Sequence, residues 1–283
     1  MAPALGEQAG AVHEIAPGRV DELASALVGF VGPGSRIVAL GGGRVIDTAK
    51  ALAAARAPGR RPRVAAVPTT LSAAEMTAVH RRAQGADASL PGVRPMIVVN
   101  DPALSASQPP ADLAASAANA LAHAAEGPAT VRASPVPALA GREAARLIGE
   151  AYRARPDEPD RDTLALAALL SGYTIDSAGY GLHHVLSQTL ARFGGVAHAQ
   201  ANAAMLPHTL GALEQRGADG AGALIPLATF LARAAGAVSL RALGVDDAVL
   251  ERCVDAAADR AELDAIPPRP DRDELRALYG AAC

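Results

Sequence analysis

The stretch RIVALGGGRVIDTAKALAAARA (36–57) decides the fold of the first part of the chain. Residues 36–40 are an arginine followed by apolar and β-branched side chains, which is typical of a short buried strand. Gly41, Gly42 and Gly43 follow, and most of the remaining residues are strong helix formers. The stretch therefore predicts a strand, a glycine turn and a helix in succession.

Strand and helix patterns alternate on both sides of this stretch. A helical stripe of apolar residues lies at 18–31, and short apolar runs at 64–68 and 95–101 predict two more strands. Such alternation is typical of a parallel sheet. Further along the chain only helical patterns are found, at 105–127, 138–154, 162–179, 182–193, 201–213, 225–236, 246–261 and 271–282. We therefore expect an α/β domain with a parallel sheet (1–103) and an all-helical domain (104–283).

The composition argues against several classes of partner. The chain has 283 residues and a net charge of −3, without a basic stripe for nucleic acid or a polybasic helix for a membrane surface. No uncharged apolar run reaches the ~18 residues that span a bilayer, and the first residues do not resemble a signal peptide. Cys253 and Cys283 are too few for a disulfide framework. We expect a cytoplasmic protein that acts on a small molecule, with a homodimer left open.

Gly41, Gly42 and Gly43 are candidates for a ligand-binding turn. Because they lack Cβ atoms, a ligand can approach their backbone N–H groups, and the following helix directs its positive dipole at an anion such as a pyrophosphate. Thr69 and Thr70 end the next predicted strand at the same edge of the sheet, where ligands of open α/β sheets bind. The glycines do not follow the GxGxxG pattern, so a tight connection without a ligand is the alternative.

Five of the seven histidines are concentrated in two segments, 119–127 and 179–208. Imidazole titrates near neutral pH and is the commonest metal ligand, so we interpret these segments as the walls of an active site. His183 lies about 100° around a helix from His184, and we expect at most one of this pair to face the site. His208 is expected to be a cap or a surface residue.

Three separate segments could each present an imidazole to one point. Asn119 and His123 are four residues apart and share a helical face, as do His184 and Gln188. His198 follows a glycine break and is expected where the next helix begins. Converging imidazoles suit acid–base chemistry or a metal with about three protein ligands. The alternative for each histidine is a hydrogen-bonded core residue.

Four segments of the chain resemble, in order and spacing, the iron-containing alcohol dehydrogenase and dehydroquinate synthase-like superfamily. They are IVALGGGRVIDTAKALA, VAAVPTTLSAAEMT, NALAHAAEG and GLHHVLSQTLARFGGVAHAQANAAMLPH. The resemblance is closest to the maleylacetate reductases and covers residues 12–283. It implies a Rossmann-like domain, a helical domain and a deep cleft between them. It also implies hydride transfer from NAD(P)H to a small keto or enoyl acid.

The resemblance also implies roles for individual positions. The positions on the cofactor side are Gly41, Gly42, Gly43, Asp47, Thr69 and Thr70, with the pyrophosphate at the glycines. The positions at which metal-dependent members carry one Asp and three His are Asn119, His123, His184 and His198. Gln188 stands where the family has another histidine in its active site.

The chain departs from the family pattern at several points. Only 35 residues precede Arg36, too few for the βα unit that carries the adenosine pocket, so we expect a shortened nucleotide-binding domain. Arg44 replaces a hydroxyl residue at the helix start, where it could neutralise a phosphate or fill the pocket. Asn119 offers a neutral amide, a poorer ligand for a divalent cation than a carboxylate, so we expect no metal. Gln188 cannot shuttle a proton.

Two functions are consistent with these residues. The first is an NAD(P)H-dependent reductase in which His184 and His198 orient the substrate and supply a proton. Arg81, Arg82 or Arg192 would hold a carboxylate of the substrate. The second is a cofactor-free descendant, a dehydratase, isomerase or cyclase, in which His123, His184 and His198 perform acid–base chemistry and no hydride moves.

Overall fold

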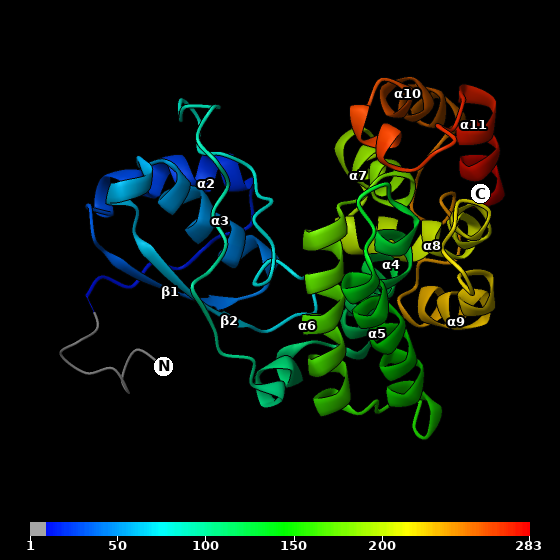
Figure 1. Ribbon diagram of the computed structural model, residues 1–283, viewed down its shortest axis with the longest axis horizontal. Helices are drawn as coiled ribbons and strands as arrows, with labels where there is room; N and C mark the ends of the chain where they lie inside the picture. Colours follow the sequence, from blue (N-terminus) through cyan, green and yellow to red (C-terminus); the bar gives the residue numbers. More distant parts are fainter. Residues whose placement is uncertain (1–9) are drawn as a thin grey trace.

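The computed structural model describes residues 10–283, and these form an α/β part followed by a helical part, as predicted (Figure 1). The first part contains the elements α2 (Val20–Leu27), β1 (Arg36–Gly41), α3 (Gly43–Ala54), β2 (Arg63–Pro68) and β3 (Ile97–Val98). The second part begins with the 3-10 helix η4 (Pro102–Ser107) and continues with α4 (Pro110–Glu126), α5 (Pro135–Arg153), α6 (Arg161–Ala178), α7 (Leu182–Phe193), α8 (His198–Glu214), α9 (Ile225–Ala234), α10 (Asp247–Ala258), the 3-10 helix η7 (Ala261–Ala265) and α11 (Arg272–Ala281). The domain boundary placed between residues 103 and 104 falls within η4 and stays a prediction.

The three strands of the described part form one parallel sheet in the order β1–β2–β3. β1 and β2 pair in register from Arg36 opposite Arg63 to Gly41 opposite Pro68. Because the two strands end together, the glycine turn and Thr69 emerge at the same edge of the sheet. The backbone N–H of Thr69 donates to the carbonyl of Gly41 over 3.1 Å, which fixes the two connections side by side.

The third strand is shorter than the predicted run at 95–101. Pro95 is the first residue of this run and Pro102 follows it, and a proline has no N–H to donate to a ladder. The N–H groups of Met96 and Val99 still donate to carbonyls of β2, over 2.8 Å and 2.9 Å. The chain therefore follows β2 for longer than the two residues of regular strand.

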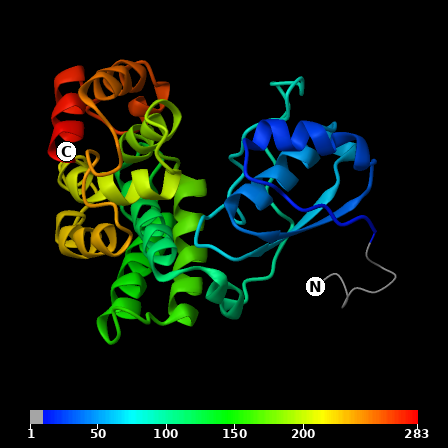
Figure 2. The same cartoon turned by 180° about the vertical axis from the view of Figure 1, so that it is seen from behind.

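Helices α2 and α3 cover one face of the sheet (Figure 2). Ile46 and Ala53 of α3 pack against Ala39 of β1 and Val64 of β2. The small alanines on both sides let the helix lie close to the strands. On the opposite face, four apolar side chains of the sheet region are exposed: Val38, Leu40, Ile97 and Val99.

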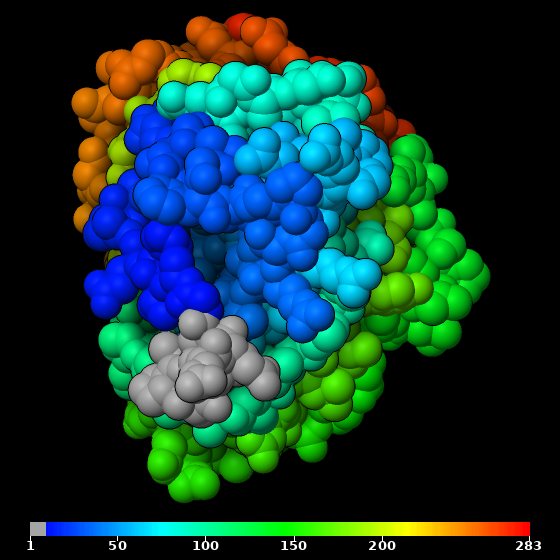
Figure 3. Space-filling model, turned by 90° about the vertical axis from the view of Figure 1, so that its left-hand side faces the viewer, coloured from blue at the N-terminus to red at the C-terminus, as the bar shows by residue number. Residues whose placement is uncertain are grey.

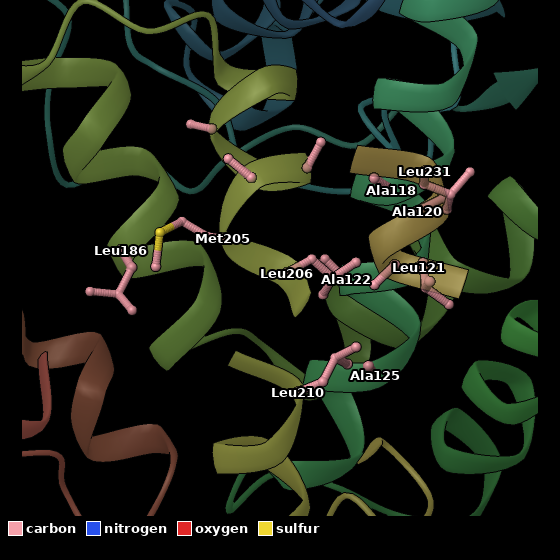
Figure 4. Close-up of a cluster of buried hydrophobic side chains, with 14 of the residues drawn as sticks. Ala118, Ala120, Leu121, Ala122, Ala125, Leu186, Met205, Leu206, Leu210 and Leu231 are labelled. Atoms are coloured by element: carbon pink, nitrogen blue, oxygen red, sulfur yellow. The ribbon is translucent and has the colours of Figure 1, made fainter. Parts of the chain in front are cut away.

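The helical part is built around α4, whose residues from Leu113 to Glu126 are all buried. A helix that is apolar on every side belongs in the interior, and α4 contacts α5, α6, α8 and α9. Figure 4 shows its alanines among leucines of neighbouring helices, including Leu206 of α8 and Leu231 of α9. With no tryptophan in the chain, the core depends on close packing of small side chains.

Within the described part of the chain, hydrogen bonds and the Arg94–Asp176 ion pair join the two parts of the molecule. The N–H of Leu71 donates to Ser116 Oγ over 2.8 Å, and Asp176 of α6 accepts from the N–H of Ala78 and pairs with Arg94. Viewed from the side of the N-terminal part, in blue and cyan, that part lies in front of the helical part (Figure 3). Within residues 10–283, no helix is long and apolar enough to cross a membrane.

Candidate active site

A cleft of about 1210 Å³ is lined by residues of both parts of the molecule. The helical part contributes the five side chains expected there from the sequence, Asn119, His123, His184, Gln188 and His198. The sheet part contributes four of the six expected positions, Gly43, Asp47, Thr69 and Thr70. Gly41 and Gly42 lie in the turn itself, outside the lining. The glycine turn and the imidazoles therefore face a common space.

The glycine turn is tightly packed against its own neighbours. Gly42 is the N-cap residue of α3, and a Cβ atom on it would lie 2.9 Å from Thr70 Cγ2. A Cβ atom on Gly41, whose φ is 155°, would lie 2.6 Å from Val45 Cγ2. Side chains are therefore excluded here by packing alone, whether or not a ligand binds. Thr70 Oγ1 is buried without a hydrogen-bond partner among the described residues, so it could form a hydrogen bond with a ligand.

The histidine wall consists of His123 and His184 stacked on one another. Their ring centroids are 4.7 Å apart and the ring planes differ by 10°. Three polar atoms of this wall and of the adjacent Asn119 are buried without a partner in the described part of the chain. They are Asn119 Oδ1, His123 Nδ1 and His184 Nε2. Unpaired buried polar atoms are costly, so their presence together marks a place for a ligand.

The remaining histidines of the segment at 179–208 differ in their surroundings. His198 is the first residue of α8, as predicted, and lies exposed in the cleft with Nε2 3.1 Å from Asn202 Nδ2. His183 is buried away from the cleft, with its ring nitrogens 2.8 Å from Thr209 Oγ1 and 2.9 Å from Asn202 Oδ1. One histidine of the adjacent pair therefore faces the site, as expected. His208 is a half-buried residue inside α8 and not a cap.

Glu126 is a site residue that the sequence reasoning missed. It ends α4, is fully buried, and lies with Oε2 2.5 Å from His184 Nδ1 and Oε1 2.6 Å from the backbone N of His183. A signal was present, because Glu126 follows His123 by three residues on a helix that is otherwise almost uncharged. A charged residue in such a helix is seldom buried unless it is paired.

Burial changes the pKa values of this cluster. It raises the pKa of the Glu126 carboxyl to about 7, and it lowers the pKa of His184 to about 3, with the nearby His198 acting in the same direction. Burial also holds the pKa of His123 well below its usual range. Both rings are therefore neutral at pH 7 and offer lone pairs to a ligand.

A polar network holds Gln188 at the next turn of α7. Arg260 donates to Gln188 Oε1 over 3.0 Å and also pairs with Glu262, whose Oε1 lies 3.4 Å from the hydroxyl of Tyr180. No local signal in the sequence indicated this network, because Arg260 lies 72 residues further along the chain than Gln188. Gln188 is therefore oriented by residues of η7 and the turn before it.

The arginines expected to hold a substrate carboxylate have different positions. Arg81 lines the cleft, and so does Arg132, which the sequence analysis did not single out. Arg192 lies over the ring of Phe193 at 5.3 Å, and neither it nor Arg82 is among the residues that line the cleft.

Comparison with known proteins agrees with this geometry. Residues 12–102 match the family model "Iron-containing alcohol dehydrogenase", and residues 113–232 match the C-terminal model of the same family. The chain belongs to the iron-containing alcohol dehydrogenase family. The resemblance inferred from the four sequence segments is thereby confirmed.

Members of this family with a reductase name are similar over most of the chain. The maleylacetate reductase of Rhizobium sp. (strain MTP-10005) is 31% identical over 87% of this chain and 73% of its own length. That of Burkholderia cepacia is 34% identical over 85% and 72%. The crystal structure of maleylacetate reductase from Agrobacterium tumefaciens superposes with a TM-score of 0.76 at 27% identity, covering 92% of this chain and 78% of that one. The chain is thus an oxidoreductase of the iron-containing alcohol dehydrogenase family.

The expectation that no metal belongs to this site is wrong for a family described as iron-containing. The expectation was based on the missing charge at Asn119, but a neutral amide oxygen is still a donor for a cation. The three unpartnered atoms, Asn119 Oδ1, His123 Nδ1 and His184 Nε2, provide oxygen and imidazole donors that suit iron or a similar divalent ion. Within residues 10–283, no three His, Cys, Asp or Glu side chains form a metal group by themselves, so a metal held here would draw on Asn119.

Proposed function

We propose that this protein is a reductase that transfers hydride from NADH or NADPH to a small keto or enoyl acid, as its maleylacetate reductase relatives suggest. The observation that carries the proposal is the cleft itself, which places a glycine turn and a helix N-terminus opposite a wall of neutral imidazoles.

The cofactor would lie against the sheet edge. The N-terminus of α3 favours a pyrophosphate because its first N–H groups have no partner within the helix. Thr70 Oγ1 supplies an unpaired hydroxyl beside it. Arg44, exposed at the start of α3 and in the cleft lining, adds a positive charge where the family pattern has a hydroxyl.

The substrate would lie between the cofactor and the histidine wall. Arg81 and Arg132 line the same cleft, and guanidinium groups match carboxylates in geometry and charge. His184, neutral at pH 7, accepts a hydrogen bond or serves as a ligand and is a poor proton donor. Burial lowers the pKa of His198 as well, but of the three imidazoles it alone is exposed to the cleft, and we assign proton delivery to it.

A bound iron or similar ion would polarise the carbonyl oxygen of the substrate as a Lewis acid. Asn119, His123 and His184 would hold it, with His198 nearby. The side chains of the protein would exclude water from the stacked rings. Arg81 and Arg132 would orient the substrate acid, and His198 would supply the proton.

The turnover assay for this proposal follows the loss of NADH or NADPH absorbance with maleylacetate as substrate, with and without added Fe²⁺ or Zn²⁺. We expect cofactor oxidation that depends on substrate. A purified, folded protein that oxidises neither cofactor with any added metal would contradict the proposal.

A second candidate is acid–base chemistry without a cofactor in the same cleft. The tight packing of Gly42 against Thr70 favours it, because that packing explains the glycines without a dinucleotide. A dehydratase, isomerase or cyclase would convert its substrate without NAD(P)H, so turnover of a keto acid in the absence of cofactor would support it.

A further inference from the structure

Glu126 occupies a junction between two helices, behind the His184 ring that lines the cleft. It is the last residue of α4 and lies beside the first turn of α7, whose N-cap is Gly181. Its side chain has no exposed surface. Isolated buried carboxylates are costly, so a specific set of partners must compensate for the burial.

The two carboxyl oxygens have separate partners. Oε1 accepts the backbone N–H of His183 over 2.6 Å, one of the N–H groups that have no partner within α7. Oε2 lies 2.5 Å from Nδ1 of His184. The positive end of the α7 dipole and this N–H both favour the ionised carboxylate. Burial acts in the opposite direction and raises the pKa of this carboxyl to about 7, so the carboxylate is the main form at pH 8. An ionised carboxylate only accepts hydrogen bonds, so the proton between the two groups then belongs on His184 Nδ1.

We propose that Glu126 is a positioning residue that holds His184 in the tautomer protonated on Nδ1, and so keeps the lone pair of Nε2 directed at the cleft. The stacked ring of His123, 4.7 Å away, fixes the plane of the His184 ring. Among the described residues, Nε2 of His184 has no hydrogen-bond partner although it is buried. A carboxylate behind an imidazole in this way sets the tautomer and raises the basicity of a metal-binding nitrogen. The inference does not depend on the proposed substrate or on cofactor binding.

The unmodified protein tests the tautomer directly. In protein with ¹⁵N-labelled imidazoles, long-range ¹H–¹⁵N spectra distinguish a protonated ring nitrogen from one with a lone pair, and a His184→Ala sample assigns the signals. At pH 8, where the Glu126 carboxyl is mainly ionised, we expect Nδ1 of His184 protonated and Nε2 bare in the metal-free protein. Nε2 protonated and Nδ1 bare would overturn the proposal.

The Glu126→Gln variant reverses the hydrogen-bond pattern. Because the N–H of His183 requires an acceptor, the amide oxygen would face it and the amide NH₂ would face His184 Nδ1. We expect the proton to move to Nε2, and the affinity for Zn²⁺ alone, measured by calorimetry, to fall roughly 10- to 100-fold. Unchanged Zn²⁺ affinity together with an unchanged tautomer would contradict the proposal.

Glu75→Gln is the matched control. Glu75 is also a buried carboxyl, 1% exposed, and like Glu126 it does not line the cleft, but among residues 10–283 it makes no hydrogen bond to a histidine, whereas Glu126 contacts His183 and His184. We expect it to leave the His184 tautomer and the Zn²⁺ affinity as they are. If Glu75→Gln changes both as strongly as Glu126→Gln, general loosening of the fold explains the effect and the positioning role is lost. If the protein binds no nicotinamide cofactor but shows the expected His184 tautomer, the proposed reductase function is wrong and the positioning role of Glu126 still holds.

Discussion

At the scale of single residues, the site depends on polar atoms that are buried and left unpaired. His184 shows the pattern most clearly, because Nδ1 is engaged by Glu126 while Nε2 has no partner in residues 10–283. Buried polar atoms in native proteins are nearly all satisfied. Those that remain unpaired beside a cleft are therefore better candidates for function than residues chosen by type alone.

The His184→Ala variant is expected to stay folded and to lose activity. Removing the ring leaves the Glu126 carboxyl without one partner, which costs about 1–3 kcal/mol of stability. Catalytic rate should fall roughly 100-fold or more, as measured by turnover alongside a circular dichroism melt. His208→Ala, outside the cleft, is the control and should keep full activity. Full activity in His184→Ala would refute the assigned role.

Glu75 predicts a dependence of stability on pH. Burial raises the pKa of its carboxyl from 4.5 to about 7 in the folded protein, so the folded chain keeps a proton that the unfolded chain releases between these values. The stabilisation is present below pH 4.5 and is lost as the pH rises through about 7.

Denaturant unfolding of the protein and its Glu75→Gln variant at pH 5 and pH 8 measures this effect. The variant should gain stability relative to the parent on going to pH 8, by up to about 3 kcal/mol. A difference that does not change with pH would show that the carboxyl titrates normally.

At the scale of elements, the glycine turn is defined by its contact with the next strand end. The Cβ position of Gly42 lies 2.9 Å from Thr70 Cγ2, and Thr70 is β-branched and has little freedom to move. The turn and the threonine pair therefore form one packed unit at the edge of the sheet.

Gly42→Ala should destabilise the protein by about 1–3 kcal/mol through this overlap. Adding Thr70→Ser removes the Cγ2 methyl and should restore much of the loss, as a double-mutant cycle of unfolding free energies would show. Purely additive effects would mean that Gly42 is required for another reason.

The sequence predicted the elements well and their partners poorly. Strands at 36–40 and 64–68 and the helix beginning at His198 followed from apolar periodicity and glycine breaks, which are local signals. The length of the third strand was overestimated, because the prolines at 95 and 102 limit the regular strand to Ile97–Val98. Contacts between residues far apart in the sequence, such as the Arg260–Gln188 hydrogen bond, leave no local signal in the sequence. Glu126 was missed although its spacing from His123 was a local signal, because its partners His183 and His184 lie 57 and 58 residues further along the chain.

At the scale of the whole molecule, the function depends on two parts that each supply one wall of a cleft. The sheet part contributes a helix N-terminus and hydroxyls, and the helical part contributes neutral imidazoles and an amide. Asp176 and Ser116 link the walls by hydrogen bonds to the loop after β2. The chain spans about three quarters of the length of its maleylacetate reductase relatives.

Titration of NADH and NADPH against the purified protein, followed by nicotinamide fluorescence, tests the central claim most directly. The account predicts saturable binding in the micromolar range, weakened when Thr70→Val removes the unpaired hydroxyl and unaffected by His208→Ala. No binding of either cofactor up to millimolar concentration, by a protein shown to be folded, would contradict it.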